Sequence, residues 1–336
     1  MLNNDFSLAG AKSDILKLVL CYMIVLLHTV ELDYTFPILR CAVPLFFMLS
    51  SYFLFSKMCR CQTPNEKKHL LYGYIKRNLQ LYSFWTLLFI PFIVQFRGWL
   101  NEGGVLLILR DVLFAGTFPA SWYIIASVYG TIFIYYASRY LPQYILLFIC
   151  FLCYSICVFS SNYGALFECC DVYEAYCCCF SNPYNSFLVS FIWILLGKYL
   201  AEHKITMSNK KLQIFLGLSF TMLLIERIAI GKLNMAVTDD CYIFLIPFCY
   251  YILIWIGRIK YLGKPLLLCR KISTITYCSH MTIAVCCSSL IKLYICERDN
   301  LGGWILMITI IFTLLLSITI LYFEKNRYLR WLRYSY

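Results

Sequence analysis

A lysine and a histidine share one apolar run near the start of this chain. Lys17 and His28 have ten residues between them, within a run that extends from residue 14 to 33. Eleven helical steps make close to three turns, so both side chains point to one face, with their Cα atoms about 16 Å apart along the axis. A cation at one mouth and a deeper imidazole suit a polar seam for general-base or nucleophilic catalysis. The alternative is a snorkelling lysine and a histidine that hydrogen-bonds a neighbouring helix.

A further cation, Arg40, lies at the start of the next apolar run, after a short connection from His28. We therefore expect the two side chains at similar depth. A guanidinium in that place can clamp an anion or a developing oxyanion. The alternative is an interfacial arginine that contacts lipid headgroups.

Ionisable residues near two later runs are also functional candidates, because charge inside a membrane span is costly. Glu226 and Arg227 end the run 211–230, where they could face a cavity and contact substrate or form an interfacial ion pair. His280 lies early in the run 273–295 and could hydrogen-bond across helices and contact substrate. For His280 the sequence favours the alternative, a packed histidine with its hydrogen bonds made.

Cysteine is abundant, with 19 residues, and most of them lie inside apolar runs, where cysteine acts as a small hydrophobic residue. Five gather in one polar loop. A disulfide, a metal site and an unpaired loop all stay open, but the spacing matches no zinc pattern, so no metal is predicted. The five are Cys169, Cys170, Cys177, Cys178 and Cys179.

The elements that must position these residues are membrane helices. Of the 336 residues, 62% are apolar and 14% are charged, and the mean hydropathy is +0.73. A soluble domain has about 25% charged residues. Open sheet edges in lipid would leave backbone groups unpaired, which excludes strands. We predict an all-α, polytopic membrane bundle of about ten transmembrane helices, near residues 14–33, 38–56, 78–96, 121–138, 142–160, 186–201, 211–230, 241–257, 273–295 and 302–323.

The chain is expected to form a single integral-membrane domain, 1–336, with ten spans over 14–323 and a basic tail, 324–336. The stretch 103–118 is short and broken by glycines and a proline, which predicts an interfacial or re-entrant piece. The first run is expected to be a span, not a cleaved signal peptide, because many spans follow it.

Charge predicts the orientation. With the N-terminus in the cytoplasm, the cytoplasmic side collects most of the 29 basic residues and few of the 17 acidic ones. The positive-inside rule then predicts both termini in the cytoplasm of a cell with this protein in its inner (cytoplasmic) membrane. The net charge of +12 is scattered in short clusters between apolar runs, so membrane lipids are the expected partner and nucleic acid is not.

These residues resemble the acyltransferase family 3, the bacterial membrane O-acetyltransferases of cell-surface glycans. The family carries a basic residue, ten residues and a histidine in its first span, as Lys17 and His28 do. Two departures stand out: Ser51 replaces the usual glycine, and Gln80 replaces a second arginine. The other matching stretches are Arg40, Val43-Pro44, Phe46-Phe47 and Ser50 to Phe53 in the second span, Lys76-Arg77 in the third, Ser121 to Ile124 in the fourth, and Ser273, Tyr277 and His280 late in the chain.

The resemblance implies acyl transfer from a cytoplasmic acyl-CoA, most often acetyl-CoA, to a hydroxyl of a glycan or lipid-linked sugar. The cations Lys17, Lys76 and Arg77 could hold the phosphates of the donor. His28 would act as general base or carry the acyl group, and Arg40 would stabilise the oxyanion. Trp122 could stack on a sugar ring as part of the acceptor site.

Two other classes of function are alternatives. A transporter or flippase of a lipid-linked glycan would also have a polar seam and basic loops, but it should show inverted repeats and broken spans in matching places, which the sequence lacks. A non-catalytic sensor or assembly protein has no feature in its favour. The sequence specifies neither the acceptor sugar, the acyl chain nor the oligomeric state.

Overall fold

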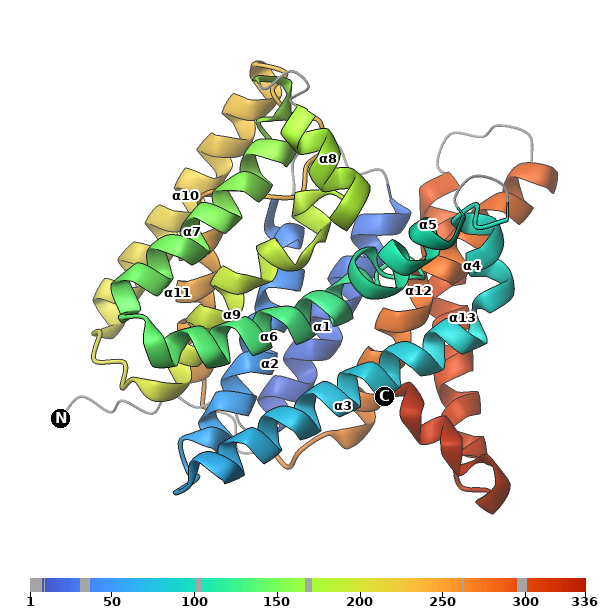
Figure 1. Ribbon diagram of the computed structural model, residues 1–336, viewed down its shortest axis with the longest axis horizontal. Coiled ribbons are helices and arrows are strands. Elements are labelled where there is room, and N and C mark those ends of the chain that lie inside the picture. Colours follow the sequence, from blue (N-terminus) through green and yellow to red (C-terminus); the bar gives the residue numbers. More distant parts are fainter. Residues whose placement is uncertain are drawn as a thin grey trace.

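The computed structural model is a bundle of helices (Figure 1). The residues it describes contain no strand, so the all-α prediction is confirmed for them. They are residues 8, 10–30, 37–100, 104–166, 171–260, 263–294 and 301–336.

The first half of the chain forms α1 (Ala11–Thr29), η1 (Pro37–Cys41), α2 (Ala42–Met58), α3 (Pro64–Leu88), α4 (Ile90–Phe96), α5 (Gly104–Arg110), η2 (Asp111–Ala115), α6 (Trp122–Tyr140) and α7 (Gln143–Ser161). The second half forms η3 (Gly164–Leu166), α8 (Asp171–Phe180), η4 (Pro183–Asn185), α9 (Phe187–Glu202), α10 (Asn209–Lys232), α11 (Leu245–Arg258), α12 (Leu267–Tyr294), α13 (Leu301–Phe323) and η5 (Arg327–Ser335).

Side-chain caps explain where several helices begin. Thr63 accepts a hydrogen bond from the Glu66 amide, and the Glu66 carboxylate in turn accepts one from the Thr63 hydroxyl, just before α3. Ser186 and Ser208 accept amide hydrogen bonds in the same way at the starts of α9 and α10. Each cap satisfies an amide that has no partner within its helix.

The third predicted span, 78–96, is broken. It corresponds to the second half of α3 together with α4, and the two helices meet at an angle of 79°. Pro91 explains the break, because proline has no amide hydrogen and disfavours a helical residue before it. Beyond the bend, side chains of α4 and α12 line a common pocket.

The helix α9 contacts α2, α6 and α7 and lies at the centre of one half of the bundle. Its Gly197 faces Ser51 of α2 so closely that a Cβ atom at this glycine would collide with the Ser51 hydroxyl. Gly130 of α6 lies equally close to Ser190 of α9. Small residues of this kind let membrane helices approach each other.

Within the part of the chain that the structure describes, six helical segments are long and apolar enough to cross a membrane, and one of them, Val172–Glu202, joins α8 to α9. The bent α3–α4 pair makes seven if it counts as one span. The α2 segment is 61% buried within the bundle and α13 only 22%, so α13 presents most of its apolar surface outward, as a lipid-facing helix does. Each of the ten predicted spans falls on a helix or on the bent pair. The count of ten spans stays a prediction, because α1, α6 and α11 do not meet the length and hydropathy of a span.

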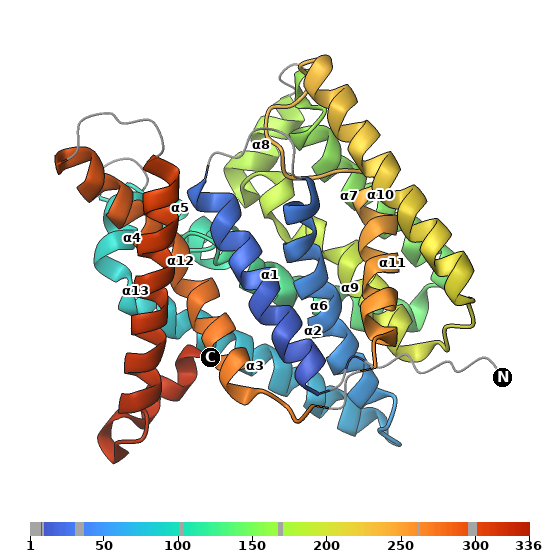
Figure 2. The same ribbon diagram turned by 180° about the vertical axis from the view of Figure 1, so that it is seen from behind.

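The helices α1 and α2 lie in the middle, with α12 and α13 on one flank and α7, α10 and α11 on the other (Figures 1 and 2). The α2–α3 and α11–α12 connections and η5 lie at one end, and α1 begins there. We call this the basic end, because these segments carry many lysines and arginines. His28, in the last turn of α1, therefore lies toward the opposite end.

The stretch predicted to be interfacial or re-entrant, 103–118, contains two short helices. The helix α5 runs directly into the π-helical turn η2, which ends at Gly116 with a positive φ of 84°. A Cβ at Gly116 would collide with Ser121 and with the backbone of Trp122. Only glycine accepts both this backbone angle and the close approach. The turn at Gly116 therefore allows the chain to pass directly against the start of α6.

Candidate active site

A cavity of about 430 Å³ lies between the last turn of α1, the start of α2, the loop before α6 and the loop before α11. Its wall includes His28, Arg40, Trp122 and Asp240. We call it the histidine cavity. Three residues that the sequence singled out, one from α1, one from η1 and one from α6, are thus brought together in one place.

His28 is exposed and forms part of the wall of this cavity. Its imidazole lies against that of His280 on α12, with the ring centroids 5.7 Å apart and the planes inclined by 32°. His280 has no exposed surface. It therefore supports the wall from behind, through His28, and has no direct access to a molecule in the cavity.

Arg40 lies in the short helix η1 and forms an ion pair that the sequence did not predict. Its Nη1 donates to the carboxylate of Asp240 at 2.6 Å. Asp240 comes from the loop between α10 and α11, and its own amide donates to the Ser161 hydroxyl. The Asp239-Asp240 pair just before an apolar run was the available signal. Its partner 200 residues away was not readable from the sequence.

Glu226 and Arg227 hold this loop in place. The Glu226 carboxylate accepts hydrogen bonds from the Ile243 and Phe244 amides at 2.8 and 2.9 Å, and Arg227 pairs with Asp239 at 2.7 Å. Glu226 is not part of the wall of the histidine cavity but supports the loop beside it, and the substrate contact expected from the sequence stays a prediction.

The loop carboxylate Asp239 has a perturbed acidity. Burial raises the pKa of Asp239, and the Tyr242 hydroxyl and the Arg227 charge oppose that rise. Opposing contributions of this kind are typical of a carboxylate held in a structural ion pair.

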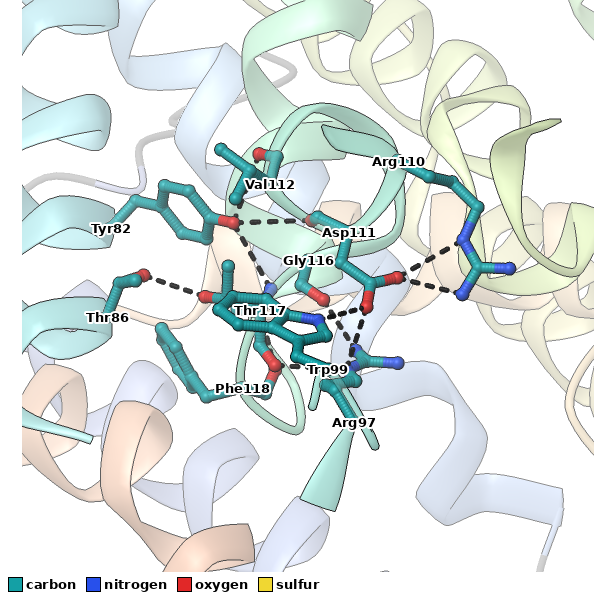
Figure 3. A network of polar contacts seen from close by, with 11 residues as sticks. Tyr82, Thr86, Arg97, Trp99, Arg110, Asp111, Val112, Gly116, Thr117 and Phe118 are labelled. Carbon is teal, nitrogen blue, oxygen red and sulfur yellow. Dashed lines mark hydrogen bonds and ion pairs between the residues drawn. The ribbon is translucent and has the colours of Figure 1, made fainter. Parts of the chain in front are cut away.

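One wall of the histidine cavity rests on a buried polar network (Figure 3). Arg97 lines the cavity and donates to the Thr117 and Gly116 carbonyls. Behind it, the fully buried Asp111 accepts hydrogen bonds from Trp99 at 2.9 Å and from Arg110 at 2.9 Å. The network fixes the loop from 115 to 120, which forms part of the wall.

Tyr82 and Thr86 of α3 complete this network (Figure 3). The Thr117 amide donates to the Tyr82 hydroxyl, which itself donates to the Val112 carbonyl at 3.1 Å. The Thr86 and Thr117 hydroxyls are hydrogen-bonded at 2.7 Å. Non-helical backbone in a membrane protein needs such internal partners, because lipid supplies none.

A second cavity, of about 370 Å³, lies nearer the basic end. Four cations line it, and we call it the basic cavity: Lys17, Lys57, Arg77 and Arg270. Lys17 lies over the Phe53 ring at 5.2 Å, and Arg270 pairs with the buried Asp14 at 2.9 Å. The sequence predicted Lys17 and Arg77 as phosphate ligands but not Lys57 or Arg270.

Lys76, which was also predicted to hold the donor, lies elsewhere. It lines a separate groove between α3 and η5, beside Trp331 and Tyr334. Neighbouring residues on a helix point about 100° apart, so Lys76 and Arg77 cannot both face the basic cavity.

An aromatic layer separates the two cavities. Phe46, Tyr123 and Tyr277 line the basic cavity, and Phe47 lines the histidine cavity. Their rings are in contact: Phe47 and Tyr123 are 4.4 Å apart, and Tyr123 and Tyr277 are 5.3 Å apart. The polar seam that the sequence predicted from lysine to histidine is therefore interrupted, because the two side chains line separate cavities with a common aromatic wall.

The cysteine cluster gives no metal centre in the part of the chain that is described. Cys177, Cys178 and Cys179 are free thiols in α8, and Cys169 and Cys170 lie outside the described residues. No group of three or more His, Cys, Asp or Glu side chains in the described ranges could hold a metal ion.

Comparison with known proteins identifies the family of this chain. Residues 11–322 match the model of the acyltransferase family 3 domain. The chain therefore belongs to this family, and its class is that of a membrane acyltransferase.

The curated relatives are longer proteins. An amino-acid racemase of Enterococcus faecalis is 25% identical over 294 residues, which are 83% of this chain and 40% of that protein. A serine/alanine racemase of Enterococcus gallinarum is 22% identical over 244 residues, which are 69% of this chain and 35% of that protein. The chain thus spans less than half the length of these relatives. No solved structure matches it.

Proposed function

We propose that this protein is a membrane O-acyltransferase that moves an acyl group, in the first place acetyl, from acyl-CoA to a hydroxyl of a cell-surface or lipid-linked glycan. The observation that carries the proposal is that His28 and Arg40 line one cavity while four cations line a second cavity behind a shared wall. The first cavity suits acyl transfer to a hydroxyl, and the second suits a polyphosphate donor.

Acyl-CoA would bind at the basic end, which we take to be cytoplasmic, with both termini on that side of the inner membrane. Lys17, Lys57 and Arg77 are the cations available for its phosphates. The long, thin thioester arm would then pass between the rings of the aromatic layer to reach His28. Lys76 would attract the donor phosphates only through the electrostatic field at the surface, because it lines another groove.

The chemistry follows from the groups in the histidine cavity. Neutral His28 accepts the proton of the acceptor hydroxyl while its oxygen attacks the thioester carbon. Arg40 stabilises the negative oxygen of the tetrahedral intermediate, and Asp240 orients its guanidinium. The intermediate collapses, the carbon–sulfur bond breaks, and the CoA thiolate takes the proton from His28. A covalent acyl-histidine is the alternative route for the same groups.

The acceptor would enter the histidine cavity from the end away from the basic cavity. Trp122 lies on its wall and offers an aromatic face for a sugar ring. Tyr184 and Asn182 of the same wall add hydrogen-bonding groups. A lipid-linked sugar could present its hydroxyl while its lipid remains in the membrane.

The test is mass spectrometry of surface glycans from cells that express the chain, its His28→Ala variant, or neither. We expect a mass increase of one acyl group with the natural chain, and none with His28→Ala at equal membrane abundance. An unchanged glycan pattern in all three samples contradicts the proposal. Loss of glycan export, with acylation intact, would instead favour the flippase alternative.

A free amino acid is a second candidate ligand of the histidine cavity. The names of the racemase relatives and the Arg40–Asp240 pair favour it, because a zwitterion can pair its carboxylate with one and its ammonium with the other. Calorimetry with serine and alanine tests this idea. Binding that Asp240→Asn abolishes would support it, and no heat at millimolar amino acid would exclude it.

A further inference from the structure

The imidazole of His280 is fully buried, and its Nδ1 has a hydrogen-bond partner. Its Nδ1 lies 2.7 Å from the Tyr277 carbonyl oxygen, one turn earlier in α12. A carbonyl can only accept, so Nδ1 carries the proton and donates it. In the neutral ring, Nε2 is then a hydrogen-bond acceptor.

That acceptor is unpaired. Among the described residues, His280 Nε2 is buried and has no hydrogen-bond partner. A buried polar atom without a partner costs free energy and calls for an explanation. The sequence expected a histidine with its hydrogen bonds made, and this nitrogen departs from that expectation.

The donor that could pair with it is the neighbouring imidazole. His28 lies across the α1–α12 contact, with ring centroids 5.7 Å apart. Two imidazoles at this centroid separation can hydrogen-bond when a nitrogen of each ring points toward the other. Catalytic hydrogen bonds are often long without substrate and shorten in the complex.

We propose that His280 is a positioning residue that accepts a hydrogen bond from His28 and thereby fixes the tautomer of the base. This inference rests on the proposed function of His28. The nitrogen of His28 that faces the cavity then has the free lone pair, as a general base requires. The Tyr277 carbonyl, His280 and His28 form a chain in which each group orients the next.

The pairing also bears on the charged form of the base. When His28 has taken the hydroxyl proton, it is an imidazolium that needs an acceptor on its far side. His280 supplies a neutral acceptor, where hydrolase triads supply a carboxylate. Because His280 does not contact the acceptor or the thioester, its loss should lower kcat and leave KM nearly unchanged.

Kinetics of the purified full chain in lipid nanodiscs test this, with acetyl-CoA and the acyl acceptor found by mass spectrometry. We expect His280→Leu to lower kcat about a hundredfold. His280→Gln, whose amide can donate and accept, should recover part of that loss. Thr282→Val is the matched control, because Thr282 is buried two residues away and its hydroxyl also has no partner in the described part. It should keep kcat within twofold.

A spectroscopic test does not depend on activity. The chain has four histidines, so its ¹⁵N-histidine spectrum in nanodiscs can be assigned by single substitutions. We expect one tautomer of His28 in the natural chain and a mixture in His280→Leu. A mixture in both, or an unchanged kcat in His280→Leu, would overturn the inference. A raised KM with unchanged kcat would make His280 a substrate-binding residue instead. Absence of acyl transfer by the natural chain would count against the proposed function, while the tautomer result stands by itself.

Discussion

In the histidine cavity each arginine has a carboxylate near it: Arg40 pairs with Asp240, and Arg97 lies 4.0 Å from Asp111. In the basic cavity, the lysines and arginines outnumber the carboxylates, and Asp14 already pairs with Arg270. In the histidine cavity the arginine charges are balanced by carboxylates, which also orient the guanidinium groups. The basic cavity keeps an excess of positive charge. Balanced charges suit a neutral acceptor and chemistry, and excess cations suit a charged donor. Substitutions in the two regions should therefore affect different kinetic constants.

The largest effect is expected for His28→Ala, which removes the base from the histidine cavity. We expect kcat to fall about 10²–10⁴-fold, because that is the usual contribution of general acid–base catalysis. The measurement is acetyl transfer from labelled acetyl-CoA in nanodiscs. His203→Ala is the control, since His203 is exposed at the end of α9 and stacks on Tyr199. An unchanged kcat in His28→Ala would contradict the assignment of the chemical step to the histidine cavity.

The next effect concerns Arg40. Arg40→Met should lower kcat about 10²–10³-fold, as loss of an oxyanion donor does. Asp240→Asn keeps the shape of the ion-pair partner but removes its charge, so we expect a smaller loss. The order of the two variants is the informative result. If Asp240→Asn lowers kcat more than Arg40→Met does, the role of Arg40 is to position the Asp240 carboxylate and not to stabilise the oxyanion.

Asp111→Asn tests whether the wall of the histidine cavity depends on its buried network. The amide cannot accept from Trp99 and Arg110 as the carboxylate does, so we expect the free energy of unfolding to fall by about 1–3 kcal/mol. Thermal unfolding in detergent measures the change. Glu174→Gln is the control, on the exposed face of α8. Equal stability of the Asp111 and Glu174 variants would contradict the supporting role of the network.

The smallest effect is expected in the basic cavity. Lys17→Met or Arg77→Met should each raise KM for acetyl-CoA about tenfold, which is about 1.4 kcal/mol, with little change in kcat. Lys76→Met is the matched control, because Lys76 is adjacent in sequence but lines another groove. High salt should raise KM of the natural chain and reduce the difference. Equal effects at Lys76 and Arg77 would mean that the general field, and not this cavity, attracts the donor.

The sequence predicted the helical class and much of the candidate site because both depend on local patterns. Long apolar runs specify helices, and Lys17 and His28 are related by helical spacing alone. Arg40 followed from its place at the start of an apolar run, and Trp122 followed from the family resemblance. The bend at α3–α4 was readable from Pro91, yet it was missed because hydropathy alone suggested one span.

What the sequence could not predict depends on contacts between distant segments. Asp240 meets Arg40 across 200 residues, and Glu226 binds amides of a loop whose path no local pattern specifies. The aromatic layer also combines residues from three helices, α2, α6 and α12. The separation of Lys76 from Arg77 needed only helix geometry, but choosing which of the two faces the donor needed the packing of α3.

The close contact between α2 and α9 limits which sequences this bundle accepts. A Cβ atom at position 197 would collide with the Ser51 hydroxyl and also with the backbone carbonyl of Met48. A glycine at 51, as in the family pattern, would remove only the first of these collisions. Gly197→Ala should therefore be rejected both in the natural chain and in a Ser51→Gly background. The backbone of α2 itself requires glycine at 197, whichever residue stands at 51.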